Sequence, residues 1–188
     1  MRLCTFYYSE GRNKIQPYAS EYCEINNRMN IHSVSVFRYT GEKKGAMSMQ
    51  QHLFDLVVRS TDIDFIGHVN NAKYLEYMEW ARFDWICQRG FTLDELQRRG
   101  LMPVVVNINI NYRRELRMLE QVQVRTRVLK IGEKSYVIRH ELYKEQGELA
   151  ADADVTMVMI DAHTRRSVPL PEDLLSELEK AAEGEQGR

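Results

Sequence analysis

The chain has 188 residues, of which 44% are hydrophobic and 28% are charged, and its formal net charge is -1. This length fits one compact domain with a hydrophobic core. The balanced charge argues against nucleic acid or an anionic membrane surface as a partner, and no apolar run approaches the ~18 residues of a membrane span.

The three cysteines, Cys4, Cys23 and Cys87, show no paired spacing typical of metal ligands, and their odd number does not suggest a closed disulfide framework. We therefore expect no metal site, no cofactor and a reducing compartment. Because the N-terminus also lacks the apolar core of a signal peptide, we expect a cytoplasmic protein. No base or motif accompanies Cys87, which favours a buried structural thiol over a nucleophile.

Residues 1–46 mix isolated tyrosines with Asn, Ser, Lys and Gly, and they show neither a helical nor a strand period. A run rich in Gly and Lys ends this region. We expect a low-order N-terminal extension over residues 1–46 and one folded domain, which includes a C-terminal helix, over residues 47–188.

The first patterned segment, residues 52–60, has the apolar, β-branched composition of a strand. A polar loop follows at residues 62–71, and a helix is predicted over residues 72–88. Gly90 is a typical stop for this helix, and a short helix is predicted over residues 93–99. Apolar side chains at three- and four-residue spacing predict that the long helix packs under a sheet. This stripe consists of Tyr74, Leu75, Tyr77, Met78, Ala81, Trp85 and Ile86.

Four extended segments follow, and the short connections between them indicate antiparallel pairing. They span residues 104–113, 121–128, 136–143 and 149–160, and a charged helix is predicted over residues 172–183. The first segment alternates between an apolar and a polar face. The apolar face is predicted to hold Val104, Val106, Ile108, Ile110 and Tyr112. The polar face, Asn107, Asn109 and Asn111, is expected in solvent, with a subunit contact or a pocket wall as the alternatives.

The loop at residues 62–71 places two carboxylates, an imidazole and two carboxamides ahead of a helix N-terminus. Such a terminus presents free backbone N–H groups and the positive end of the helix dipole. Asp64 and one of these donors can converge on a carbonyl group, which hydrolysis of an acyl compound requires. The alternative is an ordinary turn, because Asp, Asn and Gly are common in turns and Asn70 or Asn71 is a good N-cap.

The order of one strand, a long helix and four antiparallel strands predicts an α+β domain whose curled five-stranded antiparallel sheet wraps a long central helix. The run from Asp64 through Gly67-His68-Val69-Asn70-Asn71 to Arg82 resembles the signature of the hotdog-fold acyl-CoA thioesterases grouped with 4-hydroxybenzoyl-CoA thioesterase. Residues 104–114 are similar to the second strand of bacterial long-chain acyl-CoA thioesterases. The resemblance covers residues 52–180.

In that family the second aspartate of the loop is the catalytic carboxylate, which corresponds to Asp64. The resemblance also implies that the backbone amide of Asn71 polarises the thioester carbonyl and that His68 supports the site. Plant acyl-carrier-protein thioesterases have an asparagine where this chain has Ile66, so a mechanism that uses that amide is not expected here. The implied substrate-binding residues are Gly67, Asn70, Tyr74, Arg113 and Arg114.

Two roles for Asp64 remain open at this stage, general base on water and nucleophile. Glu79 is a rival carboxylate on the helix, but an intrahelical or subunit-interface pair with Arg82 is the simpler expectation. An acyl chain needs an apolar tunnel. The residues predicted to line it are Met78, Trp80, Phe83 and Met102.

The resemblance implies an enzyme that hydrolyses medium- or long-chain fatty acyl-CoA to free fatty acid and CoA. It also implies a homodimer or homotetramer with sites between subunits. The alternatives are an acyl-carrier-protein thioesterase and a non-catalytic acyl-CoA-binding module. A hotdog dehydratase is a weaker alternative, because the chain shows no matching motif.

Overall fold

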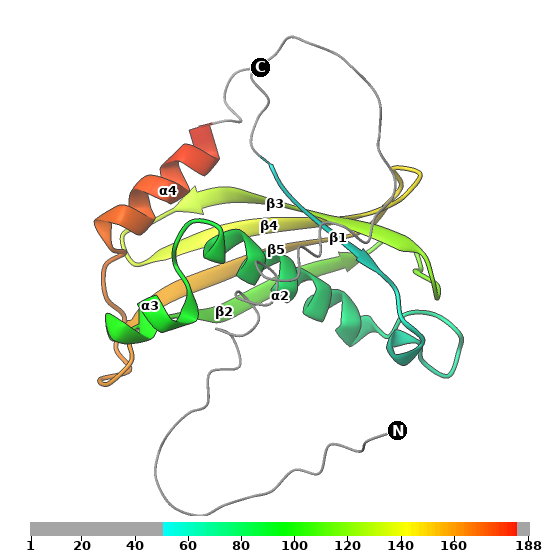
Figure 1. The fold of residues 1–188 in the computed structure, drawn as a ribbon, viewed down its shortest axis with the longest axis horizontal. Coiled ribbons are helices and arrows are strands. Elements are labelled where there is room, and N and C mark those ends of the chain that lie inside the picture. Colours follow the sequence, from blue (N-terminus) through cyan, green and yellow to red (C-terminus); the bar gives the residue numbers. More distant parts are fainter. Residues whose placement is uncertain (1–50, 184–188) are drawn as a thin grey trace, which may run out of the picture.

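The computed structural model describes residues 51–183, which form five antiparallel strands curled around one long helix (Figure 1). This confirms the predicted hotdog arrangement. The spatial order is β1-β3-β4-β5-β2, so β1 and β2 are the two edges of the sheet. The strands are β1 (His52–Val57), β2 (Leu101–Tyr112), β3 (Gln121–Ile131), β4 (Ser135–Lys144) and β5 (Leu149–Asp161). The predicted extension over residues 1–46 lies outside the described residues.

The long helix α2 lies across the inner face of the sheet, and two shorter helices lie beyond its C-terminal end (Figure 1). Among residues 51–183, no helix has both the length and the apolar character needed to cross a membrane. The helical elements are η2 (Ser60–Asp62, a 3-10 turn), α2 (Asn71–Cys87), α3 (Leu93–Arg98) and α4 (Glu172–Glu183).

The predicted apolar face of α2 is confirmed, because the helix buries this face in two clusters of core residues. Its first half packs with Val58 and Leu116, and its second half packs with α3 and α4. Cys87, which was predicted to be buried, ends the helix and is only partly buried. The fully packed residues of α2 are Tyr74, Tyr77, Met78, Ala81, Trp85 and Ile86.

The strict alternation predicted for β2 is wrong at one point. The register against β5 shifts between Val105 and Asn107, so Val106 is an extra residue in a bulge and is 57% exposed. Because a bulge places two residues opposite one, the alternation of β2 side chains between the two faces of the sheet shifts by one residue there. Val105, not Val104 or Val106, therefore shares the inner face with Ile108. Beyond the bulge, the asparagine stripe is exposed on the outer face, as predicted.

A row of polar side chains crosses the inner face of the sheet beneath α2. His52 on β1 lies opposite Thr126 on β3, which lies opposite His140 on β4. The Thr126 hydroxyl oxygen is 3.0 Å from His140 Nδ1. His140 is fully buried, and burial lowers its pKa to about 3, with the charges of Arg82 and His52 adding to the effect. The row thus holds a neutral imidazole inside the core.

Candidate active site

The motif loop, residues 62–71, folds as a narrow hairpin between η2 and α2. The Asn70 N–H donates to the Asp62 carbonyl at 2.8 Å, and the Asp64 N–H donates to the His68 carbonyl at 2.8 Å. At the tip, the Gly67 N–H donates to the Asp64 carbonyl at 3.1 Å. Gly67 has a φ of 86°, a left-handed conformation that glycine adopts without a steric penalty. The loop is therefore closed by its own backbone.

The Asp64 carboxylate is held by the same loop and leaves one oxygen open. Its Oδ1 accepts the N–H of Ile66 at 3.0 Å and the N–H of His68 at 3.4 Å. No donor among the described residues reaches Oδ2, and the side chain is only partly buried. Asp64 is thus oriented by backbone donors while Oδ2 is available to a ligand.

The N-terminus of α2 presents a backbone N–H donor beside this loop. The Asn70 side chain caps the helix by accepting the Ala72 N–H at 2.9 Å. Asn71 is the first helical residue, and it is exposed. Its N–H donates to no group within residues 51–183, and its carbonyl accepts the Tyr112 hydroxyl at 3.1 Å. The arrangement leaves one N–H donor at the positive end of the helix dipole.

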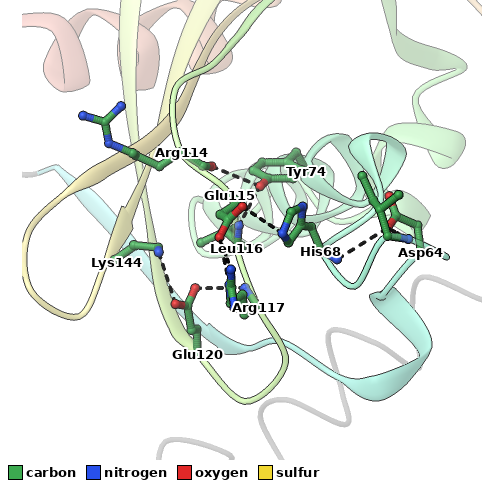
Figure 2. Close-up of polar contacts among 10 residues, drawn as sticks. Asp64, His68, Tyr74, Arg114, Glu115, Leu116, Arg117, Glu120 and Lys144 are labelled. Atoms are coloured by element: carbon green, nitrogen blue, oxygen red, sulfur yellow. Dashed lines mark hydrogen bonds and ion pairs between the residues drawn. The ribbon is translucent and has the colours of Figure 1, made fainter.

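His68 has an acidic partner that the sequence did not reveal. Its Nε2 lies 2.8 Å from Glu115 Oε2, as Figure 2 shows. Arg117 donates to the other Glu115 oxygen at 2.8 and 2.6 Å, and this hydrogen bond is the main reason that the pKa of Glu115 is lowered. The only available signal was that Glu115 follows directly after the second motif. His68 is therefore fixed by a carboxylate from the β2–β3 connection.

Tyr74 lies in the core, although a substrate contact was implied for it. Its hydroxyl donates to the Arg114 carbonyl at 3.2 Å and accepts the Leu116 N–H at 3.0 Å (Figure 2). Both bonds connect α2 to the chain segment that carries Glu115. The Tyr74 hydroxyl is thus engaged within the protein.

The two arginines implied for substrate binding both have acidic partners in this chain. Arg113 forms an ion pair with Asp152 on β5. Arg114 Nε lies 2.7 Å from Glu148, and its guanidinium points away from His68 (Figure 2). The structure therefore groups Asp64, His68 and Asn71 around one loop and directs these two guanidinium groups elsewhere.

A cleft of about 190 Å³ lies between α2 and β2. Of the predicted tunnel residues, Met78 lines this cleft, whereas Trp80, Phe83 and Met102 do not. Within the described part of the chain, no hydrogen bond or close ion pair joins Glu79 and Arg82, but the Glu79 charge still acts on the Arg82 guanidinium and partly opposes the lowering of its pKa by burial. The subunit-interface alternative for these two residues stays a prediction. The cleft is lined by Leu75, Glu76, Met78, Glu79, Arg82, Val105, Ile108 and Val155. Across residues 51–183, no three His, Cys, Asp or Glu side chains are grouped to hold a metal ion.

A family model described as the Thioesterase-like superfamily matches residues 58–178. The long-chain acyl-CoA thioesterase FadM of Escherichia coli K12 is 34% identical over 124 residues, which is 65% of this chain and 93% of FadM. A Staphylococcus aureus protein solved in complex with CoA has a TM-score of 0.68 at 25% identity, covering 73% of this chain and 89% of that chain. The DHNA-CoA thioesterase of S. aureus has a TM-score of 0.63 at 25% identity, covering 69% and 87%.

Proposed function

Because the chain belongs to the Thioesterase-like superfamily, we propose that it hydrolyses medium- or long-chain fatty acyl-CoA to a free fatty acid and CoA. FadM supports the fatty acyl group, and the relative in complex with CoA supports the carrier. The DHNA-CoA thioesterase is a similar structure whose name states a different acyl group. The acyl group is therefore the part of the proposal that needs the most direct test. The cytoplasmic location expected from the sequence stays a prediction.

One observation carries the proposal: the ten-residue loop and helix start hold both a fixed carboxylate with an open oxygen and a helical N–H that has no partner among residues 51–183. Asp64 supplies the carboxylate and Asn71 supplies the N–H. An oxyanion donor of this kind is worth about 2.7 to 4 kcal/mol in the barrier, whereas a helix dipole adds about 0.3 to 2 kcal/mol. The Asn71 hydrogen bond is thus the larger contribution at this terminus.

Two reaction routes use these groups. As a general base, Asp64 takes a proton from the water that adds to the thioester carbon, and the C–S bond then breaks to release the CoA thiolate. As a nucleophile, Asp64 itself adds to that carbon and expels the thiolate, and water then hydrolyses the mixed anhydride. In both routes Asn71 donates to the oxyanion. Oxygen-18 found in Asp64 after a single turnover in labelled water identifies the second route.

His68 is proposed to support the loop that carries Asp64. Its backbone forms two contacts with Asp64, and its imidazole contacts Glu115. Because these contacts orient the loop without touching the reacting carbon, we expect His68→Ala to lose less activity than Asp64→Ala. Glu115 is proposed as the residue that orients the His68 ring.

The acyl chain is proposed to enter the cleft between α2 and β2. Leu75, Met78, Val105 and Ile108 give this cleft an apolar lining. Each buried methylene contributes ~0.8 kcal/mol, which is roughly a fourfold preference per carbon until the cleft ends. The dependence of the rate on chain length therefore measures the depth of the cleft. Contacts of Arg113 and Arg114 with the CoA phosphates stay a prediction.

A homodimer or homotetramer is proposed, with a second copy of the chain on the β2 edge. This twelve-residue edge strand exposes four large hydrophobic side chains, Val105, Val106, Ile108 and Tyr112, at 40%, 57%, 37% and 47%. The unpaired backbone N–H and C=O groups of a long edge strand are a template for pairing with another strand. Light scattering after size-exclusion chromatography measures the assembly, and a monomer contradicts this part of the proposal.

The proposed activity is tested with a panel of acyl-CoA substrates from octanoyl to stearoyl, together with an aromatic acyl-CoA and an acyl-carrier-protein thioester. Asp64→Asn removes the charge at nearly constant shape, and a general base contributes about a hundredfold to ten-thousandfold. We expect a loss of kcat in that range. Asp55→Asn is the matched control, because Asp55 is an exposed aspartate on β1 that contacts Gln123.

Full activity of Asp64→Asn refutes the assignment of Asp64. Faster hydrolysis of the carrier-protein thioester refutes CoA as the carrier, and faster hydrolysis of the aromatic acyl-CoA refutes the fatty acyl group. Binding of acyl-CoA without turnover by the native protein identifies a binding module instead of an enzyme.

A further inference from the structure

Asp62, the other aspartate of the motif loop, is a buried carboxylate. It is 4% exposed, and a charge in that position costs several kcal/mol unless donors and an opposite charge compensate it. The Tyr77 hydroxyl donates to its Oδ2 at 2.8 Å and the Arg59 N–H donates to the same oxygen at 2.9 Å. Lys73 Nζ lies 3.8 Å from Oδ1. These groups compensate the charge and hold it in one place.

The contacts of Asp62 join the start of the loop to α2 at two levels. Its carbonyl accepts the N–H of Asn70, the residue that caps the helix. Its carboxylate reaches Lys73 and Tyr77, which lie four residues apart and so share one face of the helix. Tyr77 is fully buried. The base of the hairpin is therefore fastened both to the helix cap and to the core side of α2.

The contacts of Asp62 also affect the position of Asp64. Ile63 has extended backbone angles, φ -86° and ψ 134°, and it is the single residue between Asp62 and Asp64. The Asp64 N–H makes the next backbone bond of the hairpin, to the His68 carbonyl. A shift at Asp62 therefore moves Asp64 relative to the Asn71 N–H. Misplacing a reacting group by 1 Å can cost about a hundredfold in rate.

We propose that Asp62 is a positioning residue whose hydrogen bond with Tyr77 sets the place of Asp64 against the N-terminus of α2. This inference rests on the proposed role of Asp64. Asp62 itself does not react, because it is buried and its Oδ2 is occupied by two donors of the protein. Burial raises the pKa of Tyr77, and the hydrogen bond to Asp62 raises it further, so the hydroxyl stays a neutral donor.

The test uses Tyr77→Phe and Asp62→Asn in the full chain, with kcat and KM for acyl-CoA measured beside urea unfolding. We expect kcat to fall about tenfold to a hundredfold while KM stays within about twofold, because the lost placement acts on the transition state. The matched control is Thr126→Val, which also removes one buried hydrogen bond beneath α2 but lies away from the loop. It should retain kcat. The kcat of the double variant should be no lower than that of the less active single variant, because both changes remove the same hydrogen bond.

A purely structural role predicts a different outcome. If Tyr77→Phe keeps the native kcat and only loses stability, as Thr126→Val does, the proposal is overturned. Tyr77→Phe lacks a single oxygen atom, so it decides the question even where Asp62→Asn does not fold. Failure of the proposed function is distinguishable, because it shows as an inactive native protein or as a fully active Asp64→Asn variant.

Discussion

Replacement of His140 should make the free energy of unfolding depend less on pH between pH 6 and pH 4. His140 is fully buried on β4 beneath α2, and its Nδ1 contacts Thr126. Arg82 from α2 and His52 from β1 place further charge near it, and no described group pairs with its Nε2. Protonation would therefore create a buried cation beside another cation, which the folded protein resists.

The magnitude follows from the pKa values of the two states. The folded-state pKa of His140 is about 3, whereas an exposed histidine has a pKa of about 6.5. Between these values the unfolded chain binds one more proton than the folded chain, so stability falls as the pH is lowered. The slope is about 1.4 kcal/mol per pH unit, and the loss from pH 6 to pH 4 is about 2 to 3 kcal/mol. Above the unfolded-state pKa this contribution to the pH dependence disappears.

The assay is urea unfolding of the native protein, His140→Gln and His140→Phe between pH 6 and pH 4, at one protein concentration. Neither variant titrates at this position, so each should lose about 2 to 3 kcal/mol less than the native protein over this range, whatever its stability at pH 6. Carboxylates contribute equally to all three proteins and cancel in the difference. His163→Gln, which alters an exposed histidine, controls for loss of a surface imidazole. Parallel profiles for native protein and both His140 variants refute the reasoning.

Two further predictions concern residues with positive φ. Gly67→Ala and Gly90→Ala, at φ 86° in both cases with no atom within 4 Å of the added Cβ, should each cost about 1 to 2 kcal/mol from strain. Only Gly67→Ala should lower kcat, because Gly90 lies at the other end of α2, and equal losses of activity contradict this. Leu119 has a φ of 69° and is 72% exposed, so Leu119→Asn should raise the melting temperature by about 2 to 4 °C. A lower melting temperature by calorimetry contradicts that prediction.

The sequence by itself determined the order of the elements and their approximate bounds. The spacing of apolar residues gave the buried face of α2, and the short connections gave antiparallel strands, because each of these is a property of one continuous segment. The motif loop also located Asp64 and the helix N-terminus together, since both lie within one short stretch of chain. These features need no knowledge of what packs against them.

Only the tertiary structure decided which distant residues contact the motif loop. Glu115 contacts His68 although the two residues are 47 positions apart in the sequence. Hydrogen bonds such as those of the Tyr74 hydroxyl hold the β2–β3 connection near the motif loop. The bulge at Val106 depends on how β2 aligns with β5, which alternation within β2 does not reveal. Asp62 and Asp64 are the same residue type, two positions apart, yet one is buried against Tyr77 and the other keeps an oxygen open. Packing decided these two environments, because burial and partners depend on the whole fold.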